Sequence, residues 1–459
     1  MVQSRPDGAS SSLIDPEERS VSGPSVVAGF AAALTVWTTW YITHLPALGL
    51  RESLSIPIIL WAWSLSIFVC VRGLGNRAVT IGLLGGGVSA MLGLLILGSK
   101  LVAPGGAPAE GTVPSAFLIA AGFVAGGFFL GALWGVVGSF VPREPRSEAW
   151  LPKFAIVAAM SVIPLLVAGG LVTSTDAGMA VPDWPNTFGS NMFLYPLGPR
   201  VQPLMGEAYR DVYLEHAHRL FGAFVGLTTL TLMVWTLASE RRRWVKVLAV
   251  VAFALICVQG VLGGLRVIEN QRVLGAIHGI SGQLIFGLVV AIAAVMSGPF
   301  RSLSAVDAPA NPRRLRLVTT AALHLTLLQL VFGAIYRHFR SDHVLYSHIA
   351  FSVLVLIAAL VAGFLIRGRI DSNPARIGCR VFRRTGALIV AAVTLQFLLG
   401  WLAFFAGGKA IGAATTLQAL VRTAHQANGA LLIACLTVAV VFARGLTALS
   451  SARQGAAAA

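Results

Sequence analysis

Residues 273–297 read VLGAIHGISGQLIFGLVVAIAAVMS, a run without a single Asp, Glu, Lys or Arg. A helix needs about 20 consecutive, mostly apolar residues to cross the hydrocarbon core of a bilayer. The run is long enough, and it therefore predicts a transmembrane helix. It contains one ionisable residue, His278. An ionisable side chain inside a membrane helix is costly, and this cost suggests that His278 has a function.

Further runs of the same kind occur along the whole chain. Hydrophobic residues make up 56% of the sequence and charged residues 11%, whereas ordinary soluble domains have about 25% charged residues. This composition predicts an all-α polytopic membrane protein, and it excludes a disordered chain, a coiled coil and a secreted disulfide scaffold. The predicted spans are about 25–47, 54–72, 78–98, 115–140, 154–174, 211–238, 246–265, 273–297, 317–336, 343–366, 386–406 and 415–443.

Basic residues are concentrated in alternate loops. If the N-terminal tail is cytoplasmic, 23 of the 34 Lys and Arg residues fall on the cytoplasmic side, which is where the loops of membrane proteins are usually basic. The net charge of +16 is therefore explained by basic cytoplasmic loops and does not indicate a nucleic-acid-binding surface, so nucleic acid is not an expected partner. Acidic residues near the N-terminus argue against a mitochondrial presequence. We expect a multi-pass protein of a bacterial cell (inner) membrane, surrounded by lipid, with both termini cytoplasmic.

The last eight predicted helices contain an internal repeat. Gln259, Gln329 and Gln396 each precede a glycine by four residues, in QGVLG, QLVFG and QFLLG. The first helix of this block has Gly170 instead, with Leu166 in the place of the glutamine. Repeated helix hairpins of this kind predict two pseudo-symmetric four-helix bundles. The expected organisation is a cytoplasmic tail (1–24), an extra four-helix region (25–140), an N-terminal half (154–297), a C-terminal half (317–443) and a second cytoplasmic tail (444–459).

Four of the nine histidines occupy matched positions, near the outer start of every second helix in the repeat. A zinc site requires four ligands that include cysteine or carboxylate, and too few are near. A haem requires two axial imidazoles in an apolar slot, which a four-helix bundle can supply. The alternative is that the imidazoles only pack between helices, and a match at four positions makes that less favoured. The residues are His218, His278, His348 and His425.

The two halves differ in one charged residue. Glu215 lies three residues before His218 and on the same helix face, whereas Leu345 occupies the matching position before His348. A carboxylate in this place can transfer protons or stabilise a cation formed on a substrate; the alternative is an ion pair with Arg219. The asymmetry suggests a redox cofactor in one half and a reacting molecule in the other. Candidate partners for haem propionates are Arg219, Arg337, Arg340 and Arg422.

Several segments resemble the haem A synthase family, in order, over about residues 154–443. The specific ones are GLVTSTDAGMAVPDWPNTFG (170–189) and EHAHRLFGAFVG (215–226). Weaker matches are VQGVLGGL, HGISGQLIF, LQLVFGAIYRH and the final HQANGALL.

The resemblance implies an oxidoreductase that converts the methyl group at carbon 8 of haem O into the formyl group of haem A, for use by terminal oxidases. It implies that His348 and His425 are the axial ligands of a haem b cofactor in the C-terminal half. The substrate haem then lies at His218 and His278, with Arg219 at its propionates and Glu215 as the catalytic carboxylate. Haem O synthase and terminal oxidase assembly factors are the implied protein partners, and a homo-oligomer remains an open alternative.

The chain departs from the family in two respects. Residues 175–210 contain no cysteine, which excludes a disulfide in that loop, and residues 25–140 add helices to which we assign no function. Two other functions stay open. A bis-histidine transmembrane haem electron carrier explains the paired histidines without needing Glu215. A transporter fits the internal repeat, although transporters favour broken helices and charges at the membrane midplane.

Overall fold

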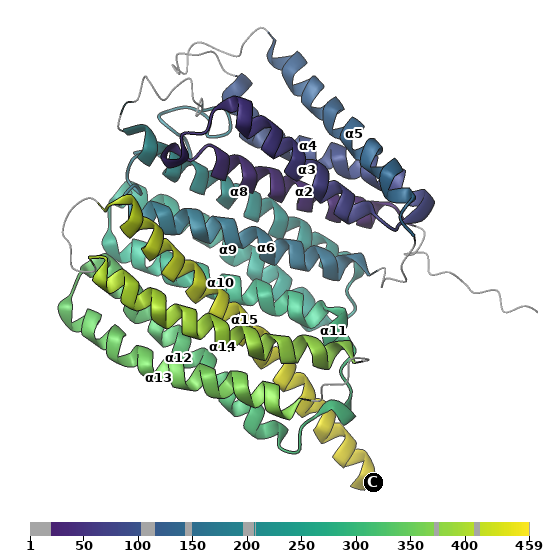
Figure 1. Cartoon of the computed structure of the whole chain (residues 1–459), viewed down its shortest axis with the longest axis vertical. Coiled ribbons are helices and arrows are strands. Elements are labelled where there is room, and N and C mark those ends of the chain that lie inside the picture. The colour runs from purple at the N-terminus through teal and green to yellow at the C-terminus, as the bar shows by residue number, and fades with distance from the viewer. Residues whose placement is uncertain are drawn as a thin grey trace, which may run out of the picture.

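The computed structural model describes residues 20–101, 115–142, 149–195, 206, 208–370, 376–407 and 414–458. The regular elements in these ranges are helices, and 12 of them are long and apolar enough to cross a membrane. The predicted all-α polytopic membrane fold is therefore confirmed. Figure 1 shows the helices side by side with roughly parallel axes, which is the arrangement that a bilayer requires.

The helices that span or flank the membrane follow the predicted runs closely. In chain order they are α2 (Ser22–Thr43), α3 (Glu52–Val71), α4 (Ala78–Leu101), α5 (Ala116–Ser139), α6 (Trp150–Ser174), α8 (Ala208–Ser239), α9 (Arg243–Glu269), α10 (Arg272–Met296), α11 (Gly298–Arg301), α12 (Pro312–Phe339), α13 (Asp342–Arg369), α14 (Ile377–Phe405) and α15 (Thr416–Ala458).

Two helices extend well beyond their predicted ends. α14 begins at Ile377 rather than near 386, and α15 continues to Ala458 through most of the segment expected to be a tail. The prediction stopped where the apolar residues stop. Arg380, Arg383 and Arg384 lie in the first turns of α14, and arginine is a good helix former. Hydropathy locates the membrane-crossing part of a helix, whereas its hydrogen bonds can continue into water.

Helices α6, α8, α9 and α10 form a closed ring in which each packs against the next and α10 returns to α6. Helices α12, α13, α14 and α15 form a second ring with the same order of contacts. We call these rings the N-terminal half and the C-terminal half. Figure 1 shows them stacked next to each other, with the helices of the extra region beyond the N-terminal half.

The contact between the halves uses the first and last helices of each ring. α6 packs on α15, and α10 packs on both α12 and α15. Polar side chains cross this contact, because Gln426 donates to the carbonyl oxygen of Leu166 at 3.4 Å and Thr423 bonds Ser174 at 3.4 Å. The rest is apolar, with Val162 and Phe286 buried against Ala430. The halves are thus held together by both polar and apolar contacts.

The extra region, α2 to α5, packs against the N-terminal half through α2. Trp37 is 1% exposed, and its ring lies 6.0 Å from that of Phe221 and 5.0 Å from that of Phe224 on α8. The Tyr213 hydroxyl of α8 donates to the carbonyl oxygen of Tyr41 at 2.9 Å. Buried aromatic contacts of this kind dominate packing energies. α2 is therefore an integral wall of the N-terminal half.

Helices α4 and α5 approach each other through glycines. A Cβ atom on Gly131 would stand 2.0 Å from the carbonyl oxygen of Gly82, and one on Gly86 would stand 2.1 Å from that of Gly127. These distances leave no room for any side chain. Glycines at four-residue spacing allow membrane helices to pack backbone against backbone. The glycine-rich composition of this region thus serves close helix packing.

Candidate functional site

The four matched histidines form two pairs, one inside each half. The ring centroids of His218 and His278 are 6.3 Å apart, and the ring planes make an angle of 85°. The centroids of His348 and His425 are 6.2 Å apart, with an angle of 78°. Each pair comes from the second and fourth helices of its ring, α8 and α10 or α13 and α15. The two halves therefore present their imidazoles in nearly the same geometry.

Each imidazole lies against a glycine of a neighbouring helix. A Cβ atom built on the glycine would stand 2.9 to 3.2 Å from the ring's Cε1 atom in all four cases. Such distances are shorter than ordinary van der Waals contacts of a Cβ atom, so the space that each ring occupies depends on the missing side chain. The contacts are Gly169 with His218, Gly263 with His278, Gly333 with His348 and Gly400 with His425.

The structure corrects the predicted register of the first repeat. The sequence comparison had aligned Gly170 with the other three glycines, but Gly169 is the residue that meets His218. Gly170 faces Thr423 and Gln426 on α15 and so belongs to the contact between the halves. Because two glycines are adjacent here, and α6 has no glutamine four residues earlier to fix the alignment, the sequence could not distinguish them.

The glutamines of the repeat hold the histidine-bearing helices by their backbone. Gln259 donates from Nε2 to the carbonyl oxygen of His278 at 3.0 Å, and Gln329 donates to that of His348 at 2.8 Å. Gln396 differs, because its Nε2 atom lies 3.3 Å from both ring nitrogens of His425. These contacts fix the heights of His278, His348 and His425 relative to the neighbouring helix.

The paired imidazoles fit the axial ligands of a haem. A metal–imidazole bond is about 2.0 Å long, so two imidazoles on opposite sides of one metal ion have ring centroids about 6.3 Å apart. The observed separations are 6.3 Å and 6.2 Å. In addition, Nδ1 of His218, His278 and His348 is buried, and the three rings interact with the backbone of Leu165, Gln259 and Gln329 respectively. A metal-bound histidine usually directs its other ring nitrogen at such a group. Within the described residues, no three His, Cys, Asp or Glu side chains converge to hold a metal by themselves.

Glu215 is 3% exposed and lies one turn of α8 from His218. Its Oε1 atom pairs with Arg219 Nη2 at 2.6 Å, and its Oε2 atom accepts from the backbone nitrogen of Val181 at 2.9 Å. The ion pair that the sequence offered as an alternative to catalysis is therefore present. It does not exclude a proton-transfer role, but it shows that the carboxylate also contacts the loop that follows α6.

The side chain of Arg219 binds the backbone of the same loop. Its guanidinium donates to the carbonyl oxygens of Asp183 at 2.6 Å, Asn186 at 2.9 Å and Val181 at 2.9 Å. Only 8% of the side chain is exposed. With the bond to Glu215, four of its five donors are directed at protein atoms, so in this conformation Arg219 anchors the loop.

The loop over residues 175–195 covers one end of the N-terminal half. The Asp183 carboxylate accepts from the backbone nitrogens of Phe188 and Gly189 at 2.8 and 2.7 Å, which closes a tight turn. Trp184 lies flat on Gly264 of α9, where a Cβ atom would stand 2.3 Å from the indole. Because Gly264 follows the glycine that meets His278, the loop covers the end of the helices just beyond the imidazole pair.

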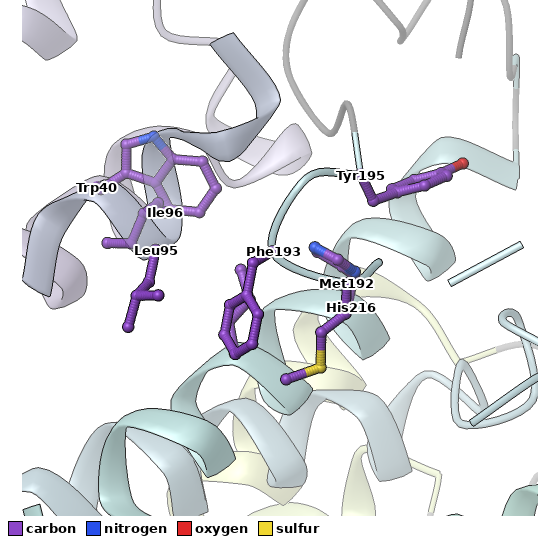
Figure 2. A pocket seen from close by; sticks show the side chains of 8 residues that line it. Trp40, Leu95, Ile96, Met192, Phe193, Tyr195 and His216 are labelled. Carbon is purple, nitrogen blue, oxygen red and sulfur yellow. The ribbon is translucent and has the colours of Figure 1, made fainter. Parts of the chain in front are cut away.

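His216 points to the other side of α8 from His218. Its Nδ1 atom bonds the Thr187 hydroxyl at 3.1 Å. A small pocket between the loop and the extra region is lined by Trp40, Phe193, Tyr195 and His216. Figure 2 shows Phe193 and His216 across from Trp40, with the ring of Tyr195 directed away from it. Burial, and after it the Asp183 carboxylate, raise the pKa of Tyr195 above its ordinary value. None of the four paired histidines lines this pocket, so it is separate from the proposed iron sites.

Arg266 is a residue that the sequence analysis did not select. It lies near the end of α9, and its Nη1 atom donates to the carbonyl oxygen of Gly178 at 2.6 Å. His338 of α12 lies beside it, since both surround Gly275. The signal that was overlooked is the repeat itself, because Arg266 comes three residues after Gly263, on the helix face that meets His278.

Comparison with known proteins gives one consistent result. Residues 152–345 match the COX15-CtaA family model, described as cytochrome oxidase assembly protein. This range includes Glu215, His218 and His278, and it ends just before His348.

Three curated relatives, each named heme A synthase, show the extent of the similarity. The protein of Lysinibacillus sphaericus (strain C3-41) is 30% identical over 197 residues, which is 42% of this chain and 60% of the relative. That of Exiguobacterium sibiricum is 28% identical over 192 residues, 41% and 59%. That of Rhodopseudomonas palustris (strain BisA53) is 27% identical over 234 residues, 44% and 60%. The chain thus matches about three fifths of the length of these relatives.

Proposed function

We propose that the chain oxidises the C8 methyl group of haem O to the formyl group of haem A, because residues 152–345 match the COX15-CtaA family model and the similar curated relatives are named heme A synthase. The observation that carries this proposal is that each half contains two imidazoles, 6.3 Å apart in one half and 6.2 Å in the other, which would be able to hold a haem iron. A haem enzyme that acts on a haem needs two such places, one for the cofactor and one for the substrate.

We assign the substrate to the N-terminal half, residues 154–297, and haem b to the C-terminal half, residues 317–443. The argument is the asymmetry of the two pairs. His218 and His278 lie beside a buried carboxylate and beneath the 175–195 loop, whereas α12 and α13 are joined by only Arg340 and Ser341. Binding a reacting molecule requires a cover that excludes water. Haem b held by His348 and His425 supplies one-electron redox chemistry.

Glu215 has two tasks in this proposal. With water as the source of oxygen, conversion of a methyl group to a formyl group releases four protons and four electrons, and the electrons must leave to an external acceptor. Glu215, a buried carboxylate one turn from His218, would accept protons at Oε1 or Oε2. Its second task is structural: Glu215 pairs with Arg219 and accepts from the Val181 nitrogen, and both contacts hold the loop over the site. Arg219 orients the loop with four of its five donors. The fifth donor, Nε, is the one that can bind the substrate propionates without release of a loop bond.

The remaining assignments follow from the same proposal. The protein lies in a bacterial inner membrane with both termini in the cytoplasm, in agreement with the distribution of basic residues. Haem O synthase supplies its substrate, and terminal oxidase assembly factors receive its product. The extra region stabilises the N-terminal half, which it contacts through Trp37 and Tyr41.

The near-identical geometry of the two pairs favours one competing function, a bis-histidine transmembrane haem electron carrier. In that case both pairs hold resident haems and no haem is altered. One experiment separates the two functions. The chain is coexpressed with haem O synthase, and the extracted haems are separated by chromatography and identified by mass spectrometry. We expect haem A to appear, and to be absent when His278→Ala replaces the wild type. Haem b and haem O without haem A contradict the proposal and support the carrier.

A further inference from the structure

We propose that Arg266 and His338 form a carboxylate-binding site at the contact between the two halves, which receives propionate groups of the bound haems. The inference rests on the proposed function and adds to it the residues that recognise the acidic edge of the porphyrin. Neither residue is among the site residues predicted from the sequence.

The first argument is position along the helix. Gly263 of α9 meets the ring of His278, and Arg266 lies three residues further toward the loop-covered end on the same face. Gly333 of α12 meets the ring of His348, and Arg337 lies four residues further toward the C-terminal end of its helix. Each half thus has an arginine about one turn, or about 5.4 Å, beyond one imidazole of its pair. A haem edge that projects past the imidazole reaches this level.

The second argument is that glycines make room for the two side chains. A Cβ atom on Gly178 would stand 2.5 Å from Arg266 Nη1. A Cβ atom on Gly275 would stand 2.8 Å from Cε1 of His338 and 3.0 Å from Arg266 Nε. Gly275 belongs to α10 in the N-terminal half and His338 to α12 in the C-terminal half. The imidazole therefore crosses between the halves and comes to lie beside the guanidinium.

The third argument is that the carboxylates near these arginines are shared. Glu215 and Asp176 both act on Arg266, but Glu215 is paired with Arg219 and Asp176 with Arg337. Among the residues that the structure describes, Arg266 makes one side-chain hydrogen bond, to the Gly178 carbonyl, and no ion pair. Within the described ranges, the ion pair of Arg337 is with Asp176, at 3.3 Å, and the Asp176 side chain is 63% exposed. Partly buried cations without paired anions raise the free energy of the fold. A carboxylate ligand at this place would remove that cost.

The fourth argument is the chemistry of the ligand. Iron porphyrins of the haem b and haem O type carry two propionates on one edge, and these are their only charged substituents. Arginine binds a carboxylate through two parallel hydrogen bonds, which gives both affinity and orientation. Arg266 on one side and Arg337 on the other bring the acidic edges of both haems to the same contact, beneath residues 176–178.

The test compares a porphyrin with free carboxylates and one without them. The purified full-length chain is titrated with iron protoporphyrin IX and with its dimethyl ester, and binding is followed by the absorbance of the bound haem. In the wild type we expect the free acid to bind about tenfold or more tightly than the ester, as the loss of a charge-assisted hydrogen bond implies. Arg266→Gln should weaken the acid about tenfold and leave the ester unchanged, and Arg266→Lys should recover part of the difference.

Two controls make the result specific. Arg243→Gln removes an exposed arginine from the other end of the same helix, and its acid-to-ester ratio should equal that of the wild type. His278→Ala removes one imidazole of the pair in the N-terminal half, so the part of the absorbance change that disappears in this variant belongs to that half. If Arg266→Gln weakens the binding of the free acid and of the ester equally, or changes neither affinity, the inference is wrong while the proposed function stands. If the wild type takes up neither porphyrin, both are contradicted.

Discussion

The α-carbon of Gly333 lies so close to the imidazole of His348 that a methyl group added to it would stand 3.0 Å from Cε1 of the ring. The same relationship links the other three paired histidines to a glycine of a neighbouring helix. Each imidazole is thus positioned by the absence of a side chain as well as by its own helix.

We expect Gly333→Ala to displace the His348 ring by a few tenths of an ångström and to shift the absorption bands of the resident haem b, or to lower its content. Gly260→Ala is the matched control, because a Cβ atom there meets nothing within 4 Å. Alanine even favours a helix over glycine by about 0.5–1 kcal/mol. Absorption spectra of the two purified variants provide the measurement. Identical spectra for Gly333→Ala and the wild type would show that the contact does not position the ring.

We expect Glu215→Ala to loosen the 175–195 loop, since it leaves the buried guanidinium of Arg219 without its carboxylate. Breaking a buried ion pair by removing one partner costs about 3–5 kcal/mol. Limited proteolysis should cut the loop faster than in the wild type, while haem b remains bound. Glu215→Gln retains an acceptor for the Val181 nitrogen and should protect the loop, yet it should also abolish haem A formation. Normal haem A yield from Glu215→Gln is incompatible with the assigned proton transfer.

We expect Trp37→Ala to destabilise the N-terminal half although Trp37 belongs to the extra region. Its indole is 1% exposed and packs on Phe221 and Phe224, and removing a buried aromatic ring costs about 3–5 kcal/mol. Trp61→Ala is the control, because Trp61 is 68% exposed. Thermal unfolding in detergent should show a lower Tm for Trp37→Ala alone. Equal Tm values would mean that the extra region does not support the half it touches.

We expect Gly131→Ala to separate α4 from α5, because its methyl group would overlap the carbonyl oxygen of Gly82 at 2.0 Å. Backbone atoms cannot move aside as a flexible side chain can, so the helices must shift. Gly126→Ala, on the same helix, has nothing within 4 Å and should behave like the wild type. A cysteine pair introduced across α4 and α5 should crosslink more slowly in Gly131→Ala. Unchanged crosslinking would argue against the close contact.

The membrane fold was predictable because its signal is strong and local. Each span is an apolar run of the required length, so the twelve runs could be found without knowing what any of them touches. The matched positions of His278 and His348 were also visible, as both follow a glutamine by 19 residues. The helix ends of α14 and α15 were less predictable, because hydropathy does not report where a helix ends in water.

The finer geometry of the site required the structure. Nothing in the sequence distinguishes Gly169 from its neighbour Gly170, although only the former meets His218. The hydrogen bond from the Val181 nitrogen to Glu215 could not be predicted either, since the two residues are 34 positions apart along the chain. Arg266 was missed for the same reason: its relationship to His338 depends on how α9, α10 and α12 pack.

The central claim is that paired imidazoles hold iron, with a resident haem b on His348 and His425. Its most direct test is the haem b content of the purified full-length chain, produced without haem O and measured as the pyridine haemochrome. We predict that His348→Ala loses the resident haem b, that His278→Ala keeps it, and that His324→Ala, which alters an exposed histidine on α12, matches the wild type. A full complement of haem b in His348→Ala would contradict the account.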